Sequence, residues 1–132
     1  MTLKELNKTV FKGKAGKCAK ETLKYLVKHW LEEDTSIYVN GYRISYHGRD
    51  WHKNTEKFDW EKIKVEENMN PRGYFEWAGN FMSMSFEGLL YDVMNDYYEG
   101  AYKREEELRK IFEKYGKYYE LGNAWNLSLY DI

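Results

Sequence analysis

Apolar side chains in residues 18–33 recur with the spacing of an amphipathic helix. Five of them follow the i, i+3, i+4, i+7, i+8 pattern that places side chains on one face: Leu23, Leu26, Val27, Trp30 and Leu31. Another face carries a row of four lysines: Lys17, Lys20, Lys24 and Lys28. Such a row is typical of a solvated surface, and the functional alternative is an edge that faces phosphate groups.

Two more helices are predicted in the second half of the chain. The first covers about residues 87–96 and the second about residues 101–115, each with one apolar face. Gly116 follows the second helix as a C′ residue, the position where a left-handed backbone ends many helices. Glu105 and Arg109 lie four residues apart, which supports this helix through an ion pair.

Asn40-Gly41 separates two segments that are rich in β-branched and aromatic residues, the strongest short signal of a hairpin. A two-residue turn at this point fixes the register of the strands. Three cross-strand pairs follow: Val39 with Tyr42, Ile37 with Ile44, and Tyr38 with Arg43. Because side chains alternate along a strand, the first two pairs share the core face and the third lies on the opposite face.

Residues 74–86 predict a second hairpin, in which Gly79-Asn80 fits a type II′ turn. This turn brings three couples onto one core face: Trp77 with Met82, Phe75 with Met84, and Gly73 with Phe86. Ser83 and Ser85 alternate onto the other face. The alternation of methionine and serine therefore predicts a strand with one apolar side and one mixed side.

A third hairpin is predicted at the C-terminal end, where Gly122-Asn123 joins residues 118–121 to residues 124–129. Residues 61–67 predict one further strand with Ile63 and Val65 turned inward. Tight turns join antiparallel strands, and the helices cluster instead of alternating with strands. The pattern therefore predicts an α+β fold, an antiparallel sheet built from three hairpins with about three helices packed on it.

Composition predicts one folded domain over residues 1–132, with a basic segment at residues 1–17. The chain has 42% hydrophobic residues and a single proline. No apolar run is long enough to cross a membrane, and residues 1–17 lack the apolar core of a secretory signal, so we expect a cytoplasmic protein. The single cysteine, Cys18, excludes an internal disulfide and a cysteine zinc cage. Neighbouring lysines act to lower the pKa of its thiol, but no partner for a reactive cysteine is identifiable, so a small structural thiol is the interpretation that we favour.

Charge is divided unevenly along the chain. Residues 1–30 hold eight lysines and two glutamates, a net charge of +6, whereas the remainder is at −7 and the whole chain at −1. This division argues against general nucleic-acid binding, which needs a dominant positive field. It permits a local anion site or electrostatically matched self-association. Aromatic residues reach 18%, which indicates either pockets and interfaces or a core filled with large side chains.

Two segments carry candidate chemistry. His47, Asp50 and His52 lie in the polar stretch 45–54, where a histidine proton shuttle is one interpretation and an exposed polar loop the other. A metal site there does not follow a known ligand spacing, and the chain contains no other catalytic motif. At Glu87-Gly88 a strand passes into a helix. Free backbone amides, close approach at the glycine and the amide of Asn95 would suit a nucleotide, and a capped hairpin is the alternative.

The stretch YFEWAGNFMSMSFEGLLYDVMND, followed by a charged helix and YYELGNAWNLSLY, is similar to small phage and prophage proteins of Gram-positive bacteria. Among these it resembles the anti-Thoeris sponge family, over roughly residues 18–130. The resemblance implies a non-enzymatic protein without a cofactor that sequesters cyclic ADP-ribose-type signals made by TIR-domain immune enzymes. It also implies a homo-oligomer with ligand pockets at subunit contacts, and the short apolar runs of the chain predict no membrane partner.

The resemblance assigns roles to four residues of this chain. Phe75 and Phe86 would stack on adenine, Asn95 would hold a ribose hydroxyl, and Arg109 would hold phosphate. Arg43 and Arg49 are additional candidates from their positions in the predicted strand and loop. The small nucleotide is a cyclic ADP-ribose isomer or a cyclic oligonucleotide. Two other functions stay open: a protein-binding inhibitor of a bacterial defence enzyme, similar to an anti-CRISPR protein, and a small hydrolase that uses the His47, Asp50 and His52 loop.

Overall fold

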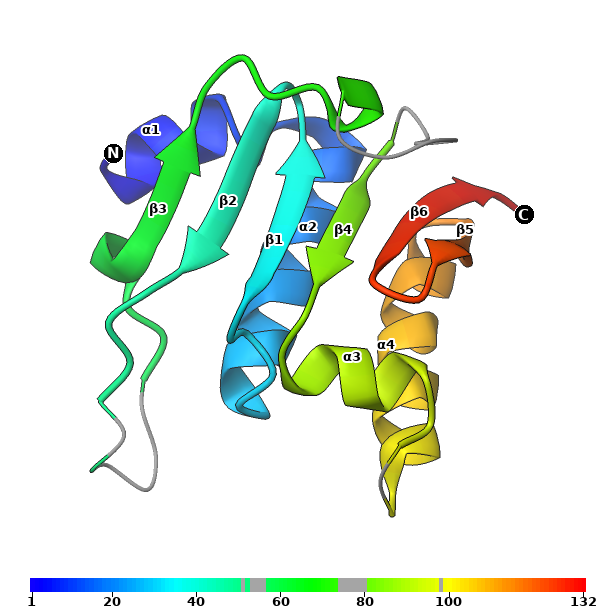
Figure 1. Cartoon of the computed structure of the whole chain (residues 1–132). Helices are drawn as coiled ribbons and strands as arrows, with labels where there is room; N and C mark the ends of the chain where they lie inside the picture. Colours follow the sequence, from blue (N-terminus) through cyan, green and yellow to red (C-terminus); the bar gives the residue numbers. More distant parts are fainter. Residues whose placement is uncertain (51, 53–56, 74–80, 98) are drawn as a thin grey trace.

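The computed structural model describes residues 1–50, 52, 57–73, 81–97 and 99–132. These residues form four helices and six strands, with short 3-10 turns at Trp60–Lys62 and Pro71–Gly73 (Figure 1). In chain order the elements are α1 (Leu3–Lys8), α2 (Gly13–Lys28), β1 (Thr35–Val39), β2 (Tyr42–Tyr46), β3 (Ile63–Glu66), β4 (Ser83–Phe86), α3 (Leu89–Met94), α4 (Ala101–Lys114), β5 (Lys117–Asn123) and β6 (Asn126–Asp131).

The strands form one antiparallel sheet in the order β3-β2-β1-β4-β6-β5, so the predicted α+β fold is confirmed. Helices α1, α2 and α4 lie on one face of this sheet, and α3 lies at its lower end (Figure 1). The core forms between these helices and the covered face of the sheet. It includes Leu23 and Leu26 from α2, Leu108 and Phe112 from α4, and Ile37 from β1.

Alternation along the strands decides which side chains enter the core. The register at Asn40-Gly41 is as predicted, with Val39 opposite Tyr42, Ile37 opposite Ile44 and Tyr38 opposite Arg43. On β4 and just before it, Met82, Met84 and Phe86 are buried in the core, also as predicted. Ser83 lies on the opposite face, where its hydroxyl is 2.7 Å from that of Ser128 on β6. The predicted partner strand and the turn at Gly79-Asn80 lie outside the described residues.

The C-terminal hairpin turns two residues later than predicted. Asn123 pairs with Asn126, so Ala124-Trp125 forms the two-residue loop in place of Gly122-Asn123. A shift in register between Leu121 and Asn123 lets β5 continue through the glycine, as at a β-bulge. The side-chain oxygen of Asn123 accepts hydrogen bonds from the Trp125 amide at 3.4 Å and from the Asn126 amide group at 2.6 Å, which fixes the turn there.

Helix α2 begins and ends about five residues before the predicted 18–33. The helical spacing of apolar residues continues to Leu31, but the backbone of Trp30 is left-handed, with φ of 60°. The Leu31 amide then donates to the Leu26 carbonyl at 2.8 Å, a bond typical of helix C-termini. Helix α4 and the left-handed Gly116 that follows it agree with the prediction.

Candidate functional site

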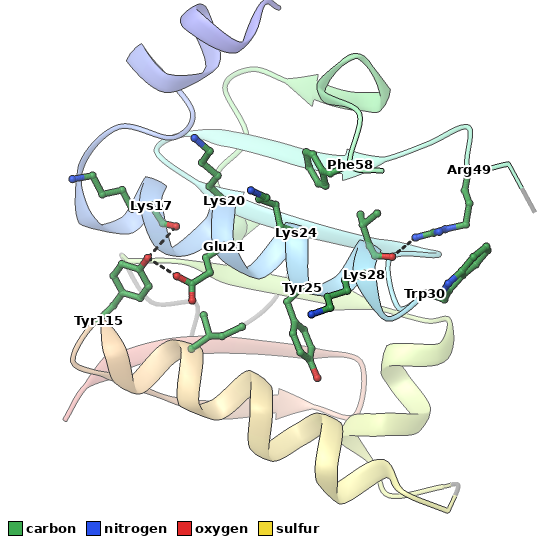
Figure 2. A pocket seen from close by; sticks show the side chains of 12 residues that line it. Lys17, Lys20, Glu21, Lys24, Tyr25, Lys28, Trp30, Arg49, Phe58 and Tyr115 are labelled. Atoms are coloured by element: carbon green, nitrogen blue, oxygen red, sulfur yellow. Dashed lines mark hydrogen bonds between the residues drawn. The ribbon is translucent and has the colours of Figure 1, made fainter. Parts of the chain in front are cut away.

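The four lysines predicted on one helix face line a cleft on the outer side of α2. The rise of 1.5 Å per residue spreads Lys17, Lys20, Lys24 and Lys28 over roughly 16 Å of helix. The cleft has a volume of about 800 Å³. It lies along α2 with Tyr115 at one end and Trp30 and Arg49 at the other, as Figure 2 shows. Its other lining residues are Glu21, Tyr25, Val27, Phe58 and Ile111.

Arg49 closes one end of the cleft as part of a buried ion pair. Its guanidinium donates to the Glu32 carboxylate and to the Val27 carbonyl, and it lies 3.8 Å from the ring centre of Trp30. The side chains of Arg49 and Glu32 are both only 3% exposed. A buried charge is stable only with a close partner, so this pair fixes the end wall of the cleft.

The other end of the cleft holds Glu21, which is the one acidic residue among the lining residues and is partly exposed. Lys114 donates to the Glu21 carboxylate at 2.6 and 2.8 Å, and the Tyr115 hydroxyl donates to it at 3.1 Å. Burial, together with this hydrogen bond, raises the pKa of Tyr115 to about 12, so the phenol stays neutral. Because Lys114 balances the charge of Glu21, the lysine row determines the sign of the potential in the cleft.

The row itself carries uncompensated positive charge. Within the described residues, none of its four lysines forms an ion pair with a carboxylate. Lys20 and Lys24 lie over the ring of Trp60 at 5.0 and 5.8 Å, contacts that orient their ammonium groups and keep their charge. Cations beside aromatic rings suit an anionic ligand that contains a flat ring.

Cys18 lies on the buried side of the same helix and takes no part in the cleft. Burial raises the pKa of its thiol to about 12, which agrees with the structural thiol that we favoured from the sequence. Desolvation by the core is the largest effect, and it outweighs the lowering of the pKa by a hydrogen bond with Thr22 and by the charges of Lys114 and Lys117. A neutral buried thiol is a weak nucleophile, which fits a structural role for Cys18.

The residues predicted as ligand contacts, as far as the structure describes them, do not come together in this cleft. Arg49 lines it, and Phe75 lies outside the described residues. Phe86 is fully buried in the core, which leaves no exposed ring face for stacking. Asn95 follows α3 and donates to the carbonyls of Tyr91 and Ala124, both at 2.8 Å. These bonds attach α3 to the β5–β6 turn.

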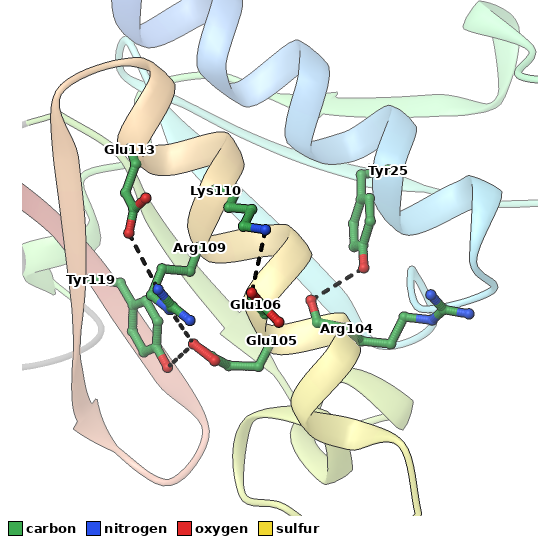
Figure 3. Close-up of polar contacts among 8 residues, drawn as sticks. All are labelled: Tyr25, Arg104, Glu105, Glu106, Arg109, Lys110, Glu113 and Tyr119. Atoms are coloured by element: carbon green, nitrogen blue, oxygen red, sulfur yellow. Dashed lines mark hydrogen bonds and ion pairs between the residues drawn. The ribbon is translucent and has the colours of Figure 1, made fainter.

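The two remaining arginines have carboxylate partners. Figure 3 shows Arg109 between Glu105 and Glu113 on α4, at 3.1 and 3.4 Å, so the predicted helical pair is present. Arg43 donates to the Ser36 hydroxyl at 3.0 Å and lies 3.7 Å from Glu66, on the sheet face opposite the helices. A phosphate at either arginine would compete with these carboxylates.

The other two predicted segments have mainly local contacts. His47 contacts Ser45 at 2.8 Å, and the Asp50 carboxylate accepts from the His52 amide at 3.0 Å. In the described part of the chain, no three His, Cys, Asp or Glu side chains gather as a metal site. At the strand-to-helix junction, a Cβ on Gly88 would lie 2.5 Å from the Glu33 carbonyl oxygen. The glycine is therefore required by packing, without any ligand.

Sequence reasoning missed the aromatic walls of the cleft. Trp30 and Tyr115 fit the periodic pattern of core residues, and Tyr25 lies one turn from a lysine on the same helix. Phe58 comes from a loop with no periodic pattern, so only the fold brings it to α2. The one available signal was that aromatic residues follow lysines of the row. Tyr25 comes directly after Lys24, and Trp30 comes two residues after Lys28.

No family, no curated protein and no solved structure matches the chain. Among the residues that the structure describes, no helix has both the length and the apolarity to span a membrane.

Proposed function

We propose that this chain binds a phosphate-bearing nucleotide in the lysine cleft of α2 and holds it without chemical change. The observation that carries the proposal is that the lysine row lines a shallow cleft whose other lining residues include the aromatic side chains of Tyr25, Phe58 and Tyr115. Phosphates would contact Lys24 and Lys28, which form no ion pair with a carboxylate of the described residues, and a base would pack against Tyr25 or Phe58. The volume of about 800 Å³ lies within the range of small-molecule sites.

The anti-Thoeris resemblance supplies the first ligands to test under this proposal. A cyclic ADP-ribose isomer has the required chemistry, an adenine ring and a pyrophosphate on one small molecule. We propose that the chain sequesters such a signal in the cytoplasm of a bacterial host cell and thereby silences the defence that TIR-domain enzymes trigger. The site differs from the one assigned by the resemblance, since the cleft uses lysines and Arg49 instead of Phe86, Asn95 and Arg109.

Thermal unfolding with cyclic ADP-ribose isomers and with AMP tests the binding. A ligand that binds only the folded state at 100 times its dissociation constant stabilises it by about 2.7 kcal/mol. For a chain of this length we expect Tm to rise by roughly 10 °C. The variant Lys24→Gln/Lys28→Gln should raise the dissociation constant by about tenfold, since each lost ion pair contributes up to about 1 kcal/mol.

The matched control is Lys4→Gln/Lys8→Gln, which removes the same charge from α1, outside the cleft. It should bind as tightly as the natural chain. An equal loss in both double variants would mean that net charge, and not the cleft, drives the binding. No rise in Tm with any of these nucleotides would refute the proposal.

Mass spectrometry of the bound ligand tests the second half of the proposal. After prolonged incubation the nucleotide should be recovered with its mass unchanged. Recovery of a cleaved product would instead favour the hydrolase alternative. Native mass spectrometry of the same sample reports whether the complex is a homo-oligomer, as the resemblance implies.

A further inference from the structure

The lysine cleft contains the same set of groups twice along its length. Each half has two lysines of α2 and one tyrosine: Lys24, Lys28 and Tyr25 in one half, and Lys17, Lys20 and Tyr115 in the other (Figure 2). The proposed function places the phosphates of one nucleotide at Lys24 and Lys28. It leaves the groups of the other half without a role, although two cations and a ring are what a second phosphate and a second base need.

The two tyrosine rings are anchored in the same way. The Tyr25 hydroxyl lies 3.2 Å from both the Arg104 carbonyl and the Glu107 carboxylate, and the Arg104 guanidinium donates to that carboxylate at 2.6 Å. The Tyr115 hydroxyl donates to Glu21, whose charge is balanced by the last residue of α4. In both halves a tyrosine is thus held by a carboxylate that a cation neutralises. An anchored ring gives up little conformational freedom when a base stacks on it, which favours binding.

The distance between the two halves sets the kind of ligand that can occupy both. With a rise of 1.5 Å per residue, the midpoints of the two lysine pairs lie roughly 11 Å apart along α2. A pyrophosphate is shorter than this, because its two phosphorus atoms share one bridging oxygen. Consecutive phosphates of a nucleic-acid strand are separated by a ribose, so a chain of a few nucleotides spans both pairs. Of the described carboxylates, Glu21 is the one that lines the cleft, and it is paired with Lys114 and not with the row.

Building on the proposed function, we propose that the lysine cleft binds a short single strand of nucleic acid. A phosphate would lie at each lysine pair and a base against each tyrosine, which for a cleft of roughly 16 Å means about two to four nucleotides. A duplex does not fit this arrangement, because its bases are stacked and paired and cannot reach the tyrosines. The whole chain has a net charge of −1, so contacts in the cleft select the ligand and a general positive field does not.

Calorimetric titration with AMP and with the adenylate trinucleotide pApApA at low salt tests the ligand class. We expect pApApA to bind about tenfold more tightly than AMP, because it also reaches the second lysine pair. Lys17→Gln/Lys20→Gln should remove this gain and weaken AMP binding much less. It should also lower the salt dependence of pApApA binding, because each phosphate contact of a single strand contributes about 0.7 to the slope of log K against log salt. The control Lys4→Gln/Lys8→Gln makes the same charge change on α1 and should keep the gain.

Amide chemical-shift mapping on the natural chain gives a second readout that needs no variant to fold. Saturating pApApA should shift Lys17 and Tyr115, whereas AMP should leave both unshifted. Equal affinities for pApApA and AMP would overturn the inference and leave the proposed function standing. Equal binding of a fully paired hairpin duplex, or an equal loss in Lys4→Gln/Lys8→Gln, would overturn it as well, since charge alone would then explain the binding. Binding of pApApA without any binding of the cyclic ADP-ribose isomers would support the single strand as ligand and refute the sequestration of that signal, so either proposal can fail alone.

Discussion

Gly16 on α2 offers a test in which helix propensity and packing predict opposite changes in the free energy of unfolding when alanine replaces the glycine. Replacing a helical glycine by alanine usually stabilises a protein by up to about 1 kcal/mol, because alanine loses less backbone freedom on folding. Here, however, a Cβ on residue 16 would lie 2.1 Å from the carbonyl carbon of Phe11 and 2.6 Å from its oxygen. These are backbone atoms of the turn before α2, which cannot rotate away as a side chain can.

The expected magnitude follows from the two opposing effects. Overpacking of a buried site typically costs about 1–3 kcal/mol, and a clash with backbone lies at the upper end of that range. After the propensity gain is subtracted, Gly16→Ala should lower the free energy of unfolding by about 1–2 kcal/mol. For a chain of 132 residues this corresponds to a fall in Tm of roughly 5 °C.

Urea denaturation followed by tryptophan fluorescence measures the effect, since the chain has five tryptophans. Gly41→Ala serves as control because nothing lies within 4 Å of its Cβ position, although its φ is 82°. That variant should show backbone strain of about 1–2 kcal/mol without a clash. If Gly16→Ala unfolds at the same or a higher urea concentration than the natural chain, the close packing of α2 on the preceding turn is wrong.

Two further predictions concern buried charge and alkaline pH. Arg49→Met should lower the free energy of unfolding by about 3–5 kcal/mol, because Glu32 then lies buried without its cation, and adding Glu32→Gln should restore part of this loss. Urea denaturation of the natural chain, the two single variants and the double variant measures the coupling. Losses in the free energy of unfolding that simply add in the double variant would contradict it. Burial and the hydrogen bond to Glu21 raise the pKa of Tyr115 from 10.0 to about 12. The folded state therefore holds this proton more tightly than the unfolded state. The contribution of the Tyr115 phenol to the free energy of unfolding is complete below about pH 10 and is lost toward pH 12. Tyr115→Phe should lose less stability over that interval than the natural chain or the exposed control Tyr102→Phe, and an equally steep loss would argue against the assigned contact.

The parts of the fold set by neighbouring residues were predictable. Asn40-Gly41 determines its own turn, and the alternation on either side then fixes the register of β1 and β2. The C-terminal turn was placed two residues early because Gly122-Asn123 has equally good turn chemistry. What decides against it is the cross-strand position of Asn126 and the bulge in β5, and neither is visible locally.

The candidate cleft was only half predictable for the same reason. Helical spacing identifies the lysine row, since all four residues belong to one element. The row lines a cleft only because Tyr115, which follows α4, and Phe58 from a loop flank α2, and these residues are far from α2 in the sequence. Conversely, Phe86 belongs by alternation to the core face, and the structure places it fully in the core.

Strand β4 has a consequence for how cooperatively the molecule unfolds. It is four residues long, yet it connects the β3-β2-β1 part of the sheet to the β6-β5 hairpin. In the described part of the sheet, the pairings between these two parts pass through β4, and its side chains Met84 and Phe86 belong to the one core that both parts share, so its ladder cannot open while the core stays intact. Native-state hydrogen exchange should therefore show the amides of β4 opening at the free energy of global unfolding, while the outer strands open at lower values.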